Sequence, residues 1–196
     1  MSLRVLERLQ AKFGDALLET HSQCGDDTAV VRADRWRDIC EWLRNDPAMA
    51  FDMFVDMCGV DYPDREPRFE VVLHLYSVEK RHRIRLKTRV GDAEGAGAEL
   101  ESVTSFWAGA DWFERETWDM MGVKFIGHPD LRRILMYPEF EGHPLRKDYP
   151  AQLTQPLIPY RTEEEAGLPL GKLAPFRDDE GMAFGRRTWT KDPEPS

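Results

Sequence analysis

The stretch RFEVVLHLYSVEKRHRIRLKTR, residues 68–89, decides the fold class of this chain. Residues 68–78 are rich in β-branched and aromatic side chains, and apolar residues recur at every second position, as in a strand with one buried face. Residues 81–89 alternate just as regularly, and Glu79-Lys80 falls between the two runs. We therefore predict a β-hairpin that turns at these two residues. The residues expected to point into the core are Phe69, Val71, Leu73, Leu75, Ile84 and Leu86.

The second strand of this hairpin has a basic face, made of Arg81, Arg83, Arg85, Lys87 and Arg89. A nucleic-acid or lipid-headgroup surface is one interpretation, and it predicts steeply salt-dependent binding. However, no aromatic residues interleave the basic positions for base stacking, and the formal net charge of the chain is −9. The alternatives are a solvated sheet edge, on which basic side chains discourage aggregation, and a face paired with acidic neighbours or a protein partner. We favour these alternatives.

Helical periodicity and stop signals place helices before and after this hairpin. Asp34 is the expected cap of the second helix, and Asp111 that of the third, with Glu114 three residues on as a capping box. Gly14 and Gly122 stand where glycine commonly ends a helix. The elements predicted are helices at residues 3–13, 35–44 and 111–121, a strand at residues 28–31 and a β region at residues 51–59.

The length and composition of the chain fit one domain with an additional segment. The chain has 196 residues, of which 41% are hydrophobic, and this supplies one core. Its three cysteines, Cys24, Cys40 and Cys58, are scattered. They fit free thiols in a reducing compartment and are too few for the four thiolates of a usual iron–sulfur cluster. The charged start and the lack of long apolar runs predict neither a secretory signal nor a membrane-spanning helix.

The last part of the sequence changes in character. From residue 151 onward, prolines and glycines recur and no periodicity survives. Such a segment cannot build a core of its own. We therefore predict a domain at residues 1–150 and an extended, proline-rich tail at residues 151–196 that lies on a partner subunit.

Two carboxylates and two histidines raise the question of a metal site. Glu116 and Asp119 share one face of the predicted helix, and His128 and His143 each stand between a glycine and a proline. A metal-dependent hydrolase would need both histidines to fold back onto that face. The sequence lacks closely spaced ligands such as His-Glu-x-x-His, and the arginines that follow both histidines would compete for the carboxylates. The hydrolase remains a minor alternative.

A rigid docking element is the interpretation we favour for residues 127–150, GHPDLRRILMYPEFEGHPLRKDYP. Its prolines fix the path of the chain, which lowers the entropy lost on binding. Its arginines are fixed positive donors, and its aromatic residues are of the kind enriched at interfaces. The chain has no Gly-x-Ser-x-Gly, P-loop or dinucleotide fingerprint, so we expect no active site of its own.

Three runs of this sequence resemble the signature of the C subunit family of respiratory complex I, the NADH:quinone oxidoreductase. They are residues 114–122, 125–133 and 141–150, and residues 54–64 are also similar to that family. The motif positions carried over are Glu114, Arg115, Glu116, Asp119, Gly122, Gly127, His128, Pro129, Leu131, Arg132, Arg133, Gly142, His143, Pro144, Arg146, Lys147 and Asp148. The resemblance implies that these residues belong to a partner-binding motif.

The resemblance also implies a fold and a place in a complex. The expected fold is α/β (α+β), with a small mixed β-sheet flanked by helices. The expected role is that of a structural subunit in the peripheral arm, on the cytoplasmic side of the bacterial inner membrane. Its main partner would be the D subunit, with the B and I subunits nearby, while NADH, FMN, iron–sulfur clusters and quinone bind to other subunits. Counterparts in energy-converting hydrogenases and in the photosynthetic homologue are the alternatives.

Overall fold

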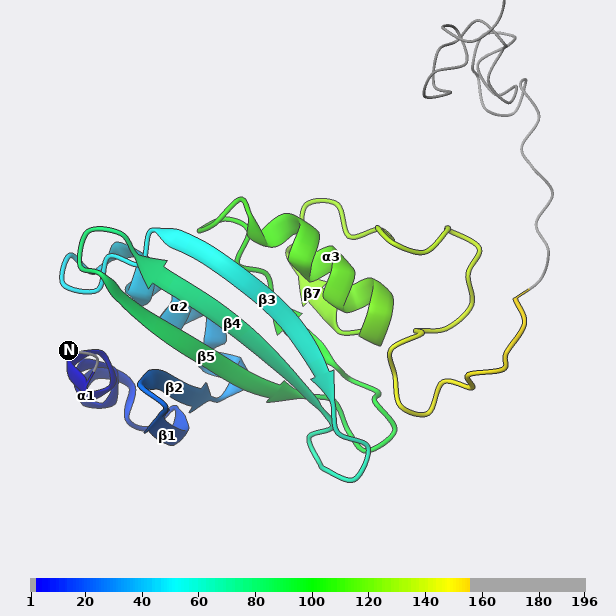
Figure 1. The fold of residues 1–196 in the computed structure, drawn as a ribbon, viewed down its shortest axis with the longest axis horizontal. Coiled ribbons are helices and arrows are strands. Elements are labelled where there is room, and N and C mark those ends of the chain that lie inside the picture. Colours follow the sequence, from blue (N-terminus) through cyan, green and yellow to red (C-terminus); the bar gives the residue numbers. More distant parts are fainter. Residues whose placement is uncertain (1–2, 156–196) are drawn as a thin grey trace, which may run out of the picture. The chain divides into compact units, whose positions relative to one another are not determined.

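A computed structural model describes residues 3–155. Its main feature is a five-stranded sheet in the order β1-β2-β5-β4-β3 (Figure 1). Strand β2 is parallel to β5, whereas all other neighbouring strands of this sheet are antiparallel. The prediction of a small mixed sheet is therefore confirmed. The strands are β1 (Leu17–Gln23), β2 (Asp26–Val31), β3 (Met53–Asp61), β4 (Phe69–Ser77) and β5 (His82–Val90).

The hairpin predicted at residues 68–89 forms β4 and β5. Phe69 pairs with Val90 at one end and Ser77 with His82 at the other, and the chain turns at residues 78–81. The six side chains expected to face the core are all at most 1% exposed. This part of the prediction is confirmed, because a period of two is a strong constraint once one face is buried.

Three helices form where they were predicted, with small shifts at their ends. They are α1 (Leu3–Phe13), α2 (Trp36–Asn45) and α3 (Ala110–Met121), and a short 3₁₀ helix, Ala33–Arg35, precedes α2. Helix α3 ends at Gly122, which has a φ of 82°, as the sequence indicated. The sequence did not indicate β1, nor the short parallel pair β6 (Glu99–Glu101) and β7 (Lys124–Ile126). These strands are polar or only a few residues long.

Both predicted helix caps are wrong. Asp34 forms an ion pair with Arg32 at 2.6 Å, and neither α2 nor α3 has a side-chain cap hydrogen bond. Asp111 lies within the first turn of α3, and Glu114 accepts a hydrogen bond from the backbone N–H of Val103, 2.8 Å away. The capping-box pattern is local, so it could not anticipate a tertiary partner for Glu114.

The core lies between the sheet and the helices. Helix α2, which lies behind the long strands in Figure 1, buries the four side chains expected to face inward, Trp36, Ile39, Cys40 and Leu43. Helix α3 adds Met120 and Met121 to the same core. A methyl group on Gly59 of β3 would meet Thr117 and Met121 at 3.0 and 3.1 Å. Glycine at this position therefore lets α3 approach the sheet closely.

Residues 127–155, here called the irregular segment, contain neither helix nor strand. The segment follows β7 and returns along α3 (Figure 1). The tail predicted at residues 151–196 lies outside the described residues from residue 156 onward. The predicted boundary at residue 150 therefore stays a prediction.

Candidate docking site

One buried carboxylate attaches the irregular segment to α3. The side chain of Asp119 is completely buried, and its Oδ2 accepts hydrogen bonds from the backbone N–H groups of Ile134, Leu135 and Met136 at 3.0, 2.9 and 2.9 Å. The guanidinium of Arg133 binds the other oxygen. Burial opposes ionisation of Asp119, but these four donors outweigh it and lower its pKa. The carboxylate thus fixes three successive residues of a segment that has no regular structure.

Further contacts of the same kind extend this attachment. Arg133 also donates to the carbonyl oxygens of Phe140 and Gly142 at 2.8 and 3.0 Å. Arg115, on α3, donates to the carbonyl oxygens of Arg132 and Arg133 at 3.1 and 3.2 Å. Guanidinium groups therefore satisfy backbone carbonyls that a helix or sheet would otherwise pair. The motif arginines act here as internal cross-links.

A second buried ion pair holds the far end of the segment to the sheet. Arg68, which is 3% exposed, donates to both oxygens of Asp61 at 2.7 and 2.8 Å and to Asp148 at 3.0 Å. The backbone N–H of Lys147 also donates to Asp61, at 2.7 Å. Hydrogen bonding to Arg68 lowers the pKa of Asp61 despite its burial. Sequence reasoning missed Asp61 and Arg68. Arg68 binds Asp148, 80 residues away, and Asp61 binds the N–H of Lys147, 86 residues away, so no local spacing signals these contacts.

The two histidines of the Gly-His-Pro turns lie at different ends of α3. His128 contacts the backbone carbonyl of Asp111 through Nε2 at 3.2 Å. His143 contacts the carbonyl of Asp119 through Nδ1 at 2.9 Å. Within residues 3–155, no three histidine, cysteine, aspartate or glutamate side chains come close enough together to hold a metal ion. The four ligands of the hydrolase hypothesis are thus not brought into one site, and Glu116 is exposed.

Gly122 and Arg146 close the junction between α3 and the segment. Arg146 donates from Nε to the carbonyl of Met121 at 2.6 Å, and its guanidinium lies 5.0 Å from the ring centre of Phe69. A methyl group on Gly122 would come within 2.7 Å of the His143 ring and would also collide with Arg146. Glycine is required here both for its positive φ and for the space.

The attachment leaves an apolar groove open beside α3. This groove, here called the α3 groove, has a volume of about 530 Å³ and is lined by Trp112, Phe113, Arg115, Glu116, Ile134 and Leu135. Trp112 is 68% exposed and Leu135 is 57% exposed. Aromatic side chains and arginine are enriched at protein interfaces, and Trp112, Phe113 and Arg115 all line this groove. The backbone bonds to Asp119 hold Ile134 and Leu135 in place on one wall of the groove.

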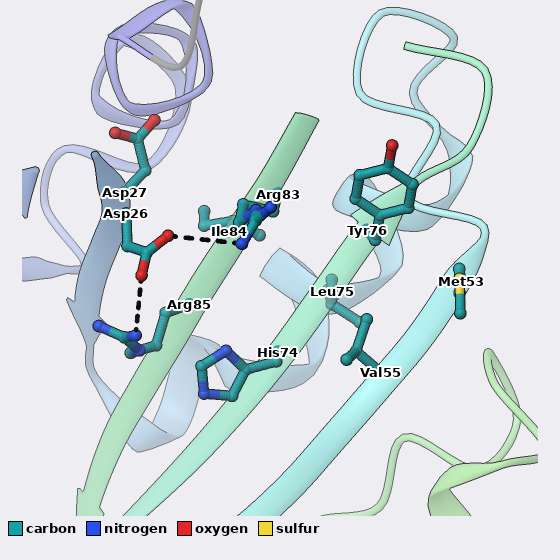
Figure 2. Close-up of a pocket in the computed structure, with 10 residues that line it drawn as sticks. All are labelled: Asp26, Asp27, Met53, Val55, His74, Leu75, Tyr76, Arg83, Ile84 and Arg85. Atoms are coloured by element: carbon teal, nitrogen blue, oxygen red, sulfur yellow. Dashed lines mark hydrogen bonds and ion pairs between the residues drawn. The ribbon is translucent and has the colours of Figure 1, made fainter. Parts of the chain in front are cut away.

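The basic face of β5 is paired with carboxylates of its own chain. Glu70, which is 2% exposed, contacts Lys87 at 2.9 Å and Arg89 at 3.4 Å. In Figure 2, Asp26 bridges Arg83 and Arg85, at 3.8 and 3.4 Å, beside a hollow of about 470 Å³. Strand β5 lies inside the sheet, so the interpretation as a sheet edge is wrong. The interpretation as a face paired with acidic neighbours is confirmed.

This α+β fold, with an anchored irregular segment and an exposed apolar groove, defines a candidate protein-binding domain. None of the helices among the described residues is long and apolar enough to cross a bilayer. Residues 29–155 match the family described as "Respiratory-chain NADH dehydrogenase, 30 Kd subunit". The chain belongs to this family, and the resemblance inferred from its motifs is confirmed.

Named relatives agree with this assignment. The chain is 50% identical over 146 residues to the C subunit of the NADH-quinone oxidoreductase of Roseiflexus castenholzii, a match that spans 74% of this chain and 82% of the relative. It is 46% identical over 142 residues to the C 2 subunit of the corresponding enzyme of Rhizobium etli, over 72% and 74% of the two chains. A chain in the structure of the membrane-bound sulfane sulfur reductase, an archaeal respiratory membrane complex, is similar with a TM-score of 0.62 and 26% identity. That match covers 76% of this chain and 86% of the other.

Proposed function

We propose that this chain is the C subunit of NADH-quinone oxidoreductase and that it binds the D subunit of the complex through the α3 groove. In this proposal it is a structural subunit of the peripheral arm, near the B and I subunits and on the cytoplasmic side of the membrane. NADH, FMN, iron–sulfur clusters and quinone would be held by other subunits. The family membership and the relatives with 46% and 50% identity support this role.

One observation carries the choice of the α3 groove. Asp119, on α3, binds three consecutive backbone N–H groups, and these bonds hold Leu135 on the groove that Trp112 of α3 also lines. Both side chains stay more than half exposed. Ordering an irregular segment costs roughly 1–2 kcal/mol per residue in backbone entropy. A segment ordered in advance spares a binding partner that cost. The buried ion pairs thus prepare an apolar surface for a protein partner.

The proposal is tested by placing a charge in the groove. Leu135→Glu should reduce co-purification with the D subunit at least tenfold, because a carboxylate would be desolvated against apolar side chains. Leu18→Glu is the matched control, since Leu18 is also 57% exposed but lies on β1. Both variants should keep the circular dichroism spectrum of the unmodified chain. Equal recovery of the D subunit with both variants would reject the α3 groove as the docking surface.

A second candidate is the equivalent subunit of another membrane-bound respiratory complex. This candidate is supported by the structural similarity to a chain of the sulfane sulfur reductase complex. The identity of 26% to that chain is lower than the 46–50% to the C subunits of NADH-quinone oxidoreductases. Mass spectrometry of the intact complex that co-purifies from the native host separates the two, because it identifies the subunits that accompany this chain.

A further inference from the structure

Glu114 is a buried carboxyl that takes no part in the α3 groove or in attaching the irregular segment. It lies on α3 and is 0% exposed. Its Oε1 accepts one hydrogen bond, from the backbone N–H of Val103 at 2.8 Å. Its Oε2 is buried without a hydrogen-bond partner among the described residues. An unpaired carboxylate oxygen in such a place is costly, because burial removes its hydration and no donor of the described residues replaces it.

The charged groups around Glu114 do not neutralise it. Arg37, on α2, donates instead to the carbonyl of Ser102 at 2.9 Å and to the hydroxyl of Ser105 at 3.3 Å. Its positive charge favours ionisation of Glu114 only through space, and this effect on the pKa is smaller than those of burial, the two hydrogen bonds and Asp111. Asp111, on the preceding turn of α3, acts in the opposite direction.

The remaining neighbours are polar or weakly acidic. The thiol of Cys40, on α2, is fully buried, and burial followed by the nearby Glu114 raises its pKa. The Ser102 hydroxyl lies beside Glu114 but is also 2.8 Å from the Thr104 hydroxyl. The Nε2 atom of His128 lies 3.3 Å from the carboxylate of Asp111. Within residues 3–155, no group that packs against Glu114 therefore forms an ion pair with it.

These surroundings determine the protonation of Glu114. Burial raises its pKa to about 7, against the lowering influence of Val103 and Ser102. A neutral carboxyl needs less solvation than a carboxylate and adds a donor that the site lacks.

We propose that Glu114 is a proton-binding site of the folded chain, and that release of its proton weakens the attachment of α3 to residues 102–104. Glu114 lies between α3 and the segment that joins β6 to α3, whose Val103 N–H it binds. Ionisation would strengthen that one bond but would leave a desolvated charge at this contact, and the cost of burial is the larger effect. Helix α3 also carries Asp119 and one wall of the α3 groove. Proton release would therefore lower the affinity for a partner in that groove, a consequence that rests on the proposed function.

Infrared difference spectroscopy tests the proton site on the 196-residue chain. The unmodified chain should show a protonated carboxyl band that is lost with a midpoint near pH 7. Glu114→Gln should lack this band, whereas Glu116→Gln, which changes an exposed carboxyl on the same helix, should keep it. A band that persists in Glu114→Gln, or is absent from the unmodified chain above about pH 5, would overturn the proposal. If Glu114→Gln fails to fold, carboxyl NMR of the ¹³C-glutamate-labelled unmodified chain decides it, because one glutamate must titrate near pH 7.

Binding measurements test the coupling separately. The dissociation constant for the D subunit should rise several-fold between about pH 6 and pH 8 in the unmodified chain, across the raised pKa, and should stay constant in Glu114→Gln. A constant value in both proteins overturns the coupling, while the infrared titration still decides the proton site. Absence of any binding to the D subunit would overturn the proposed function and the coupling together, and would leave the infrared result intact.

Discussion

Asp119 is the residue on which the docking site depends. Replacing it with alanine would leave Arg133 and three backbone N–H groups without their acceptor. We expect Asp119→Ala to lower the free energy of unfolding by about 3–5 kcal/mol, the usual cost of breaking a buried ion pair. Urea titration measures this loss, and hydrogen exchange should show faster exchange at the amides of Ile134 to Met136.

Glu116→Ala is the matched control, because Glu116 lies three residues away on the same helix and is exposed. Its effect on stability should stay within about 0.5 kcal/mol, as for most surface positions. Similar losses in the two variants would contradict the role assigned to Asp119. Arg133 binds Asp119 and two carbonyl groups of the irregular segment. It should therefore be essential to the fold of this segment, independently of any role in binding a partner.

Glu114 should make stability fall as pH rises toward neutrality. Because its pKa is raised in the folded chain from 4.5 to about 7, the folded state binds more protons than the unfolded state between these values. The stabilisation is complete below the unfolded pKa and is lost as pH rises through the folded pKa. The loss is at most about 3 kcal/mol. Glu114→Gln, which stays neutral, should be more stable than the unmodified chain at about pH 8, and an unchanged pH profile in urea titrations would contradict this.

At the scale of elements, the end of α3 depends on one glycine. Gly122→Ala would place a side chain at a φ of 82° and against the ring of His143 and the guanidinium of Arg146. The left-handed conformation alone costs roughly 1–2 kcal/mol for a residue with a Cβ, and the contact with His143 adds to it. We expect a lower thermal midpoint and a weakened contact between Arg146 and Met121. Gly25→Ala is the control, because Gly25 also has a φ of 82° but has open space around it. Its loss of stability measures the cost of the backbone conformation alone, and the additional loss in Gly122→Ala measures the steric clash.

Elements with a strong period were predictable, and those defined by their neighbours were not. The core faces of β4, β5 and α2 follow from residues such as Leu73, Leu86 and Ile39, which recur at the period of their own element. Strand β1 has the polar sequence LLETHSQ, and it becomes a strand because β2 offers it a paired edge. The predicted cap at Asp34 failed because Asp34 binds the neighbouring Arg32, and the one at Asp111 failed because the helix begins one residue earlier, at Ala110.

At the scale of the whole molecule, stability should peak on the acidic side of neutrality. Asp61, Glu70, Asp119 and Asp148 all have lowered pKa values in the folded chain. Their contribution is present above their unfolded pKa values, near 3.8 to 4.5, and is lost as pH falls. Glu114 acts in the opposite direction up to about 7. Burial lowers the pKa values of His74 and His143, so their contribution grows as pH rises toward the unfolded value of 6.5. Thermal midpoints recorded across this range should pass through a maximum between about pH 5 and pH 7, and a steady rise up to pH 8 would contradict the role assigned to Glu114.

The sequence by itself determined the central hairpin, the positions of the three helices and the family. Each of these follows from a local pattern of the sequence: a hydrophobic period of two for the hairpin, a period of 3.6 for the helices, and an ordered motif for the family. Only the tertiary structure decided what the motif residues do within the chain. Asp119 binds Arg133, Asp61 binds Arg68 and the backbone N–H of Lys147, and Arg68 also binds Asp148. Folding brings together groups that lie far apart in sequence. The free energy of a buried charge depends on the groups that surround it in space, which no spacing along the chain records.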